Sequence, residues 1–263
     1  MSYVTAKNLK NYANGTLLSI SDMSNIRMTQ NNILSINSLD NLGQALIDRF
    51  RYINGRSTQH EHNSYNFRSG DLVTTADVCY YGCSFTYGIG VELNSRWTNQ
   101  IDRARGYSSN NFGVEAIGID EILNIFTITS RFVKMKRAVF LLPAASRQTI
   151  AVPNNMYINA LPMHDQLIQS PEAKHYASIW YQLPNEYFID RASSSIQLIV
   201  RLAELQNISC IFATWDNEVF DILPAVKVPE VVGQKKEDPR GSDGLHPGVV
   251  WHTRLAQEVM KLL

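Results

Sequence analysis

The sequence predicts an α/β protein in which a parallel sheet carries helices on both faces. Short apolar runs have the length and composition of buried strands. They are 78–83, 138–142 and 209–214, with a shorter strand at 110–114. Between and after them, apolar residues recur at helical spacing. These segments are 94–105, 120–133, 192–206 and 248–263. In such a sheet, ligands bind at the carboxyl ends of the strands.

The segments outside this alternation are polar or rich in proline. Residues 1–37 have the composition of an arm, and 39–50 have the spacing of one amphipathic helix. We therefore divide the chain into an N-terminal extension, 1–70, and a main domain, 71–263. Residues 148–190 contain several prolines and aromatics and are typical of a binding loop or lid. Those aromatics could stack on sugar rings, but packing against the sheet is the more frequent role. The composition of residues 226–241 predicts a charged, solvated loop.

Composition limits the classes of partner. Acidic and basic residues balance at 24 each, which does not favour nucleic acid as a partner. The three cysteines, Cys79, Cys83 and Cys210, show no metal-ligand spacing, and their odd number argues against a disulfide framework. The His60-Glu61-His62 triplet is more typical of a loop than of a metal site. We expect no metal, cofactor or membrane span. Without an apolar leader we expect a cytoplasmic protein, with association with a virion as an alternative.

The glycine-rich stretch after the first strand, 79–91, is open to three interpretations. A phosphate-binding loop requires a lysine that this stretch lacks. A dinucleotide fingerprint requires a third glycine where Leu93 stands. The third interpretation is that Ser84, at the carboxyl end of the strand, is the nucleophile of a hydrolase. From this stretch alone, a structural turn capped by Ser84 is equally well supported.

A second motif near the C-terminus changes that balance. Asp243 and His246 are three residues apart, so a turn entering a helix places them on one side. The carboxylate can orient the imidazole through one ring nitrogen and leave the other free to accept a proton from Ser84. Alone, this pair is more typical of a surface turn. Together with Ser84 at a strand end, it predicts a Ser-His-Asp triad.

These motifs resemble the SGNH (GDSL-type) hydrolase superfamily, over about residue 66 to the C-terminus. Residues 82–88, Gly-Cys-Ser-Phe-Thr-Tyr-Gly, are similar to the first block of that family, with Cys83 in place of an aspartate. Residues 243–247, Asp-Gly-Leu-His-Pro, match its last block. Residues 65–69 are similar to a segment that leads into the first block in polysaccharide-linked members, although an edge strand is an equal alternative.

The two middle blocks of the family depart further from the pattern. In residues 111–122, Ala116 takes the place of the glycine whose backbone N–H lines the oxyanion hole, and Gly118 follows two residues later. In residues 143–146, Ala145 takes the place of the oxyanion asparagine, so that amide donor is missing. Ser146 or Arg147 is the candidate replacement. The resemblance therefore implies an oxyanion hole formed by the N–H groups of Ser84 and Ala116 with one of these side chains.

The resemblance implies a flavodoxin-like three-layer α/β/α sandwich and a serine esterase. Its expected substrate is a short acyl group, such as acetyl, on a carbohydrate or small molecule. The alternative is a weakly active or inactive subunit of a larger assembly such as a virion, docked or oligomerised through the N-terminal arm. Cys83 and Ala145, both departures from the family pattern, favour this alternative.

Overall fold

The structure, a computed structural model, describes residues 63, 67–152, 156–160, 178–180, 182–223, 226–227 and 239–263. The predicted arm, the amphipathic helix at 39–50 and the His60-Glu61-His62 triplet lie outside the described residues. The division at residue 70 stays a prediction. Phe67 and Arg68, which precede it, are both buried in the main domain.

A five-stranded sheet, in the order β2-β1-β3-β6-β7, forms the centre of the described structure. The strands are β1 (Thr75–Gly82), β2 (Ser109–Gly113), β3 (Lys134–Leu142), β6 (Ser209–Thr214) and β7 (Val226–Lys227). All neighbouring pairs are parallel. The order is that of flavodoxin-like doubly wound sheets, in which the connections run outward in both directions from the first strand. The predicted fold class is thereby confirmed.

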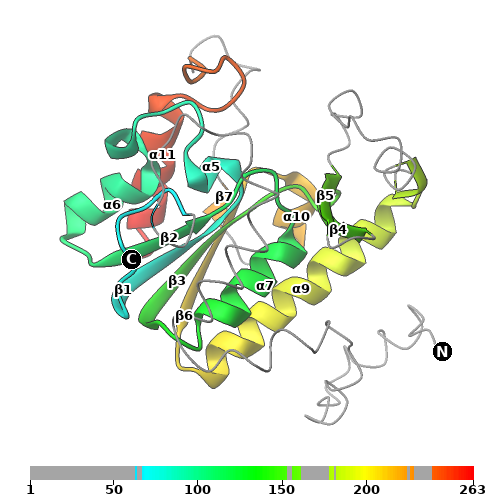
Figure 1. The fold of residues 1–263 in the computed structure, drawn as a ribbon, viewed down its shortest axis with the longest axis horizontal. Helices are drawn as coiled ribbons and strands as arrows, with labels where there is room; N and C mark the ends of the chain where they lie inside the picture. Colours follow the sequence, from blue (N-terminus) through cyan, green and yellow to red (C-terminus); the bar gives the residue numbers. More distant parts are fainter. Residues whose placement is uncertain are drawn as a thin grey trace.

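Helices cover both faces of this sheet (Figure 1). On one face lie α6 (Trp97–Arg105) and α11 (Val249–Met260), which pack on each other. On the other lie α7 (Ile119–Thr129) and α9 (Asn185–Leu205). The two short helices α5 (Ser84–Tyr87) and α10 (Asn217–Asp221) follow the carboxyl ends of β1 and β6. The described part of the chain thus forms three layers, and the turns that lead into α5 and α10 lie at the carboxyl rim of the sheet.

An aromatic row across four strands fixes their register beneath α7. Phe112 on β2, Tyr81 on β1, Phe140 on β3 and Phe212 on β6 are directly paired neighbours. Their rings stack at centroid distances of 5.3, 5.0 and 5.1 Å. Phe126 of α7 meets the Tyr81 and Phe140 rings edge-on. Because a one-residue slip would turn every side chain of a strand to the other face, this row specifies how the strand ends line up at the rim.

Several predicted boundaries were wrong. Asn94 and Ser95 lie in a 3₁₀ turn (Leu93–Ser95), and α6 begins after Arg96, with no side-chain cap. The helix predicted from residue 192 begins at Asn185, because Pro184 precedes a full helical turn that we assigned to the loop. Strand β7 lies in a segment predicted to be loop. Residues 67–69 form no edge strand.

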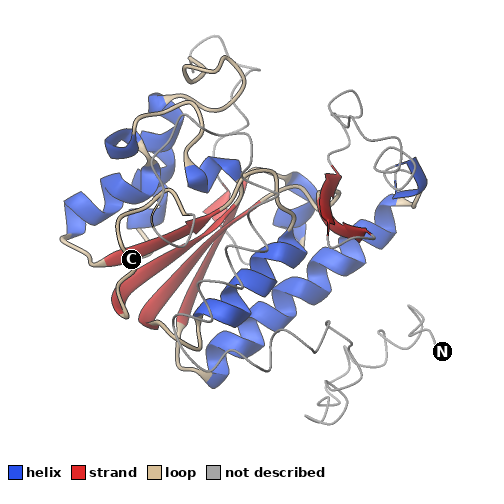
Figure 2. Cartoon of the chain, viewed as in Figure 1, coloured by secondary structure: helices blue, strands red, loops and turns tan. Residues whose placement is uncertain are grey.

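The insertion after β3 contains regular structure of its own. Strands β4 (Gln148–Val152) and β5 (Met156–Ala160) form a two-stranded antiparallel sheet separate from the central one (Figure 2). It packs against α7. The described aromatics of this insertion, Trp180, Tyr187 and Phe188, pack on one another. Arg191 lies over the rings of Trp180 and Tyr187.

The interface between α6 and α11 contains a buried histidine. His252 of α11 is fully buried, and its Nδ1 accepts a hydrogen bond from the backbone N–H of Trp97, 3.3 Å away. Trp97 is the first residue of α6, so the imidazole supplies the cap that Arg96 does not. An accepting Nδ1 requires the neutral ring. Burial, together with the nearby charges of Arg96, Arg68 and His246, lowers the pKa of His252 to about 3.

We expect the free energy of unfolding to decrease as the pH is lowered, because the buried His252 must stay uncharged in the folded protein. Its ordinary pKa is 6.5, so between pH 6.5 and 3 the unfolded chain binds a proton that the folded chain excludes. The free energy of unfolding should then decrease by up to about 1.4 kcal/mol per pH unit in that window. Urea denaturation at pH 7 and pH 5 measures this, with His252→Gln as the comparison. From pH 7 to pH 5 the wild type should lose about 2 kcal/mol more than the variant. Equal losses in the two proteins would contradict the prediction.

Candidate active site

Ser84 lies where β1 ends at the carboxyl rim of the sheet. The strand stops at Gly82, where a Cβ atom would come within 2.2 Å of the Thr86 hydroxyl. The chain turns at once into α5, whose first residue is Ser84. Gly88 ends this helix with φ of 85°, a left-handed conformation that glycine adopts readily. The tight turn thus holds the Ser84 side chain, only 4% exposed, at the strand end.

The glycine-rich loop receives the C-terminal segment rather than a nucleotide. Gly90 has φ of 80°, and a Cβ atom there would lie 2.8 Å from Oδ1 of Asp243. A Cβ on Gly241 would lie 2.5 Å from the Gly90 carbonyl oxygen. That oxygen accepts a hydrogen bond from the Ser242 backbone N–H at 2.8 Å. Two facing glycines therefore let the segment that carries Asp243 and His246 pack directly on the loop that follows Ser84.

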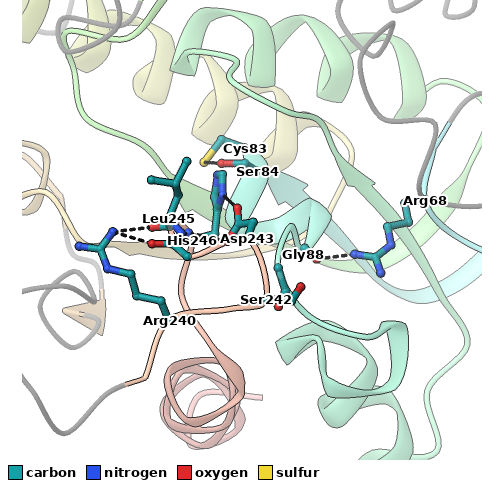
Figure 3. Close-up of polar contacts among 11 residues, drawn as sticks. Arg68, Cys83, Ser84, Gly88, Arg240, Ser242, Asp243, Leu245 and His246 are labelled. Carbon is teal, nitrogen blue, oxygen red and sulfur yellow. Dashed lines mark hydrogen bonds and ion pairs between the residues drawn. The ribbon is translucent and has the colours of Figure 1, made fainter.

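Asp243 and His246 form the predicted pair. Nδ1 of His246 lies 2.5 Å from Oδ2 of Asp243 (Figure 3). Oδ1 of Asp243 accepts the backbone N–H groups of Leu245, at 3.1 Å, and His246, at 3.0 Å. Both carboxylate oxygens are thus engaged. With Nδ1–H donating to the carboxylate, Nε2 of His246 is left as a proton acceptor.

The hydrogen bonds to Asp243 keep its carboxylate ionised. Partial burial alone would raise its pKa. The hydrogen bonds from the His246 ring and from two backbone N–H groups outweigh burial, so the pKa lies below its ordinary value of 3.8. Asp243 therefore carries its negative charge at any pH near neutrality.

The structure brings Ser84 and His246 to the same rim but does not join them by a hydrogen bond. The His246 ring meets the Phe85 ring edge-on at 5.9 Å, and Phe85 follows Ser84 directly. Among the described residues, the hydroxyl of Ser84 contacts the Cys83 sulfur, at 3.9 Å, and donates no hydrogen bond to His246 (Figure 3). Such bonds between nucleophile and base are often long without substrate. The triad stays a prediction at this link.

An aromatic cluster around Phe85 supports this arrangement and was missed by the sequence analysis. The Phe85 ring stacks on Trp215 at 4.4 Å and meets Trp251 edge-on at 5.3 Å. Trp215 directly follows β6, and Trp251 belongs to α11. Phe85, the residue after Ser84, thus packs against two segments that are distant from it in the sequence. The available signal was the position of Trp215, directly after a strand end.

The two predicted backbone donors are free to act. Within the described part of the chain, the N–H groups of Ser84 and Ala116 have no hydrogen-bond acceptor. Ala116 has φ of 60°, the left-handed conformation that favours glycine, which explains why a glycine pattern aligns there. Gly118 has another role: a Cβ there would lie 2.3 Å from the Arg147 carbonyl oxygen.

The candidate side-chain donors were Ser146 and Arg147, and of these Arg147 contacts Cys83, the residue before Ser84. Nη1 of Arg147 lies 3.5 Å from the Cys83 sulfur, and its guanidinium lies over the Trp215 ring at 5.6 Å. Ser146 is partly exposed and makes no hydrogen bond through its side chain among the described residues. Ala145 is buried, and its carbonyl oxygen accepts a hydrogen bond from Gln148.

Two buried arginines anchor the loop after Ser84 from behind. Arg68 donates to the carbonyl oxygens of Gly88 and, at 2.9 Å, Val91. Arg96 donates to the carbonyl oxygens of Arg68, at 2.6 Å, and Tyr87, at 3.2 Å. Burial lowers the pKa of Arg96 to about 9 and also lowers that of Arg68. Arg68, which belongs to the segment 65–69 noted in the sequence, therefore holds the loop after Ser84 in place.

The described residues contain no cluster of three or more His, Cys, Asp or Glu side chains suited to a metal ion. All three cysteines are free thiols. None of the helices in the described ranges combines the length and apolar character needed to cross a bilayer.

The fold and the rim together define a doubly wound α/β protein with a serine, a His-Asp pair and, within the described ranges, backbone donors without an acceptor at the carboxyl ends of its strands. No family model matches the chain, and no curated protein sequence matches it. Solved structures with similar folds carry names from the lipolytic and esterase classes.

One similar structure is a proposed lipolytic protein of the G-D-S-L family from Desulfitobacterium hafniense. It is 11% identical, with a TM-score of 0.45, over 73% of this chain and 100% of that one. A proposed acylhydrolase from Bacteroides fragilis is 14% identical, with a TM-score of 0.43, over 81% and 93% of the two chains. A psychrotrophic esterase from Pseudoalteromonas sp. is 11% identical, with a TM-score of 0.44, over 72% and 98%. At these low identities we base the functional argument on the site itself.

Proposed function

We propose that this protein is a serine ester hydrolase of the SGNH type. The observation that carries the proposal is the Asp243–His246 pair, packed through Gly90 and Gly241 against the loop that follows Ser84. A surface Asp-x-x-His turn needs no such close contact with a second loop. The contact joins the segment that carries His246, a potential base, to the loop that follows Ser84, whose backbone N–H has no acceptor among the described residues, and this supports the proposal.

In the proposed mechanism, Ser84 Oγ attacks the ester carbonyl carbon while its proton passes to Nε2 of His246. Asp243 stabilises the resulting imidazolium. The N–H groups of Ser84 and Ala116 donate hydrogen bonds to the carbonyl oxygen, which becomes negative. The alcohol leaves with the proton from His246, and an acyl-enzyme remains. Water, deprotonated by His246, then attacks the acyl carbon, and the bond to Ser84 Oγ breaks as His246 returns the proton to that oxygen, which releases the acid.

The proposed substrate carries a short acyl group, such as acetyl, and a carbohydrate is the proposed alcohol. The short acyl group is supported by the depth of Ser84 and by the Phe85 and Trp215 rings beside it. The carbohydrate rests on the sequence resemblance. The described aromatics of the insertion are engaged with each other and with Arg191, so they lend it no support.

A fluorophosphonate probe tests the mechanism directly, because it forms an adduct only with an activated serine. We expect one adduct, located by mass spectrometry on the peptide that contains Ser84. His246→Ala should slow labelling at least about a hundredfold, since the base would be lost. Ser194→Ala, at a partly exposed position of α9, is the matched control and should label normally. A folded wild type without an adduct would instead favour the alternative, an inactive subunit of an assembly.

A further inference from the structure

The guanidinium of Arg147 occupies an unusual position for a charged group. It sits between the Trp215 ring and the Cys83 sulfur, one residue from Ser84. Among the described residues it forms no ion pair at contact distance, although its charge partly offsets the rise that burial causes in the pKa of Asp216, and its only hydrogen bond goes to that sulfur, a weak acceptor. Most of its five N–H donors therefore have no protein partner in the described structure.

The backbone of Arg147 is held firmly. The N–H of Arg147 donates to the Ala144 carbonyl oxygen at 3.0 Å, which closes the turn after β3. Its own carbonyl oxygen lies against Gly118, where no side chain would fit. The ring of Trp215 supports the guanidinium from one side through a cation–π contact. A cation fixed in this way is already oriented before any substrate arrives.

The same region lacks the side-chain donor that the sequence pattern leads one to expect. Ala145 has no polar group, and Ser146 has no contact that directs it towards Ser84. The Cys83 sulfur, in contrast, lies 3.9 Å from the Ser84 hydroxyl and 3.5 Å from the Arg147 guanidinium. The nucleophile and the cation thus share one neighbouring atom.

We propose that Arg147 is the side-chain donor of the oxyanion hole, and that its charge stays available because Cys83 carries no carboxylate. This proposal rests on the ester hydrolase function above. As Ser84 Oγ bonds to the carbonyl carbon, the π electrons of the carbonyl move onto its oxygen. Arg147 donates hydrogen bonds to that oxygen without giving up a proton, beside the N–H groups of Ser84 and Ala116.

Cys83 explains why such a cation can act there. An aspartate at this position would place a carboxylate within ion-pair distance of the guanidinium and would compete with the oxyanion for it. A thiol has no charge to compete with. The two departures from the sequence pattern, Cys83 for aspartate and Ala145 for asparagine, are then one coupled change: the cation replaces the amide, and position 83 carries no acid that would pair with it.

Steady-state kinetics on p-nitrophenyl acetate test the role of Arg147. We expect Arg147→Ala to lower kcat roughly a hundredfold or more, with KM changed by less than about threefold, since the oxyanion exists only in the transition state. Arg147→Lys keeps a point charge, so its kcat should lie between those of the wild type and Arg147→Ala. Arg137→Ala is the matched control: Arg137 also lies over a ring, that of Tyr107, but it belongs to β3, whereas Arg147 lies in the turn after the carboxyl end of that strand. It should keep wild-type kcat.

A matched pair at position 83 tests the coupling. Cys83→Asp and Cys83→Asn introduce side chains of equal size, and only the first is charged. We expect kcat of Cys83→Asp to be at least about tenfold below that of Cys83→Asn, and this gap should vanish when Arg147→Ala is added. If both variants fail to fold, the Arg147 series alone decides.

Three results would overturn the proposal. The first is an Arg147→Ala enzyme with wild-type kcat. The second is a loss confined to KM for esters with an anionic acyl group, which would assign Arg147 to substrate charge. The third is a charge gap at position 83 that persists without Arg147. Ser84→Ala, measured in parallel, separates these from failure of the esterase function, which would show as equal rates for Ser84→Ala and wild type.

Discussion

Ser84→Ala should reduce hydrolysis of p-nitrophenyl acetate by at least about a thousandfold, because the covalent route through the serine would be lost. The same loss should appear in acetate release from an acetylated oligosaccharide. The remaining rate would reflect the backbone donors alone, which still stabilise attack by water. The fold should persist, because the side chain of Ser84 contributes only a weak contact to the Cys83 sulfur.

Ser194→Ala again serves as the comparison, since Ser194 is a partly exposed serine on α9 whose hydroxyl donates to the Asp190 carbonyl oxygen. Its kcat/KM should match the wild type. Circular dichroism and the thermal midpoint of each variant show whether the fold is intact. Equal hydrolysis by Ser84→Ala and wild type, both folded, would remove Ser84 from the chemistry and leave only the fold.

Asp243→Asn should reduce kcat by roughly 10³- to 10⁴-fold. The structure gives the reason in detail. Oδ1 of Asp243 accepts two backbone N–H groups, so the amide oxygen of an asparagine would take that place. The NH₂ group would then face Nδ1 of His246, where the carboxylate now lies at 2.5 Å. Nδ1 would have to become the acceptor, the proton would move to Nε2, and Nε2 could no longer receive a proton from Ser84.

Asp77→Asn is the control for this change. Asp77 lies near the start of β1, at the end of the strand far from Ser84, where its Oδ1 accepts a hydrogen bond from Lys136 at 2.7 Å and its Oδ2 accepts one from the Ser108 backbone N–H at 3.2 Å. Its removal leaves the residues at the carboxyl rim unchanged, so kcat should match the wild type.

Titration of Asp243 itself should not contribute to the effect of Asp243→Asn between pH 5 and pH 8, because the pKa of Asp243 lies below 3.8 and the carboxylate is ionised throughout. The stabilising effect of this carboxylate is fully present above its ordinary pKa and is lost only as pH falls through the lower, folded value. A kcat for Asp243→Asn within tenfold of the wild type would contradict the assigned role.

The local sequence pattern predicted the three central strands of the sheet, β1, β3 and β6. The continuous apolar runs around Val78, Val139 and Ile211 all became central strands, because a strand buried on both faces admits few polar residues. The start of α9 and strand β7 were missed. An aromatic, charged segment such as 185–191 has no clear periodicity, and the two residues of β7 pair only because β6 offers an open edge.

The sequence by itself determined that Asp243 and His246 would pair, since three residues of separation in a turn bring side chains together wherever the turn lies. It also located Ser84 at a strand end. Only the tertiary structure decided what lies around them: Arg147 and Trp215 beside Cys83, Arg68 behind the loop, and His252 beneath α6. These contacts join segments that lie far apart along the chain. No local spacing encodes such contacts, because they arise from strand order and from the aromatic register that aligns the strand ends.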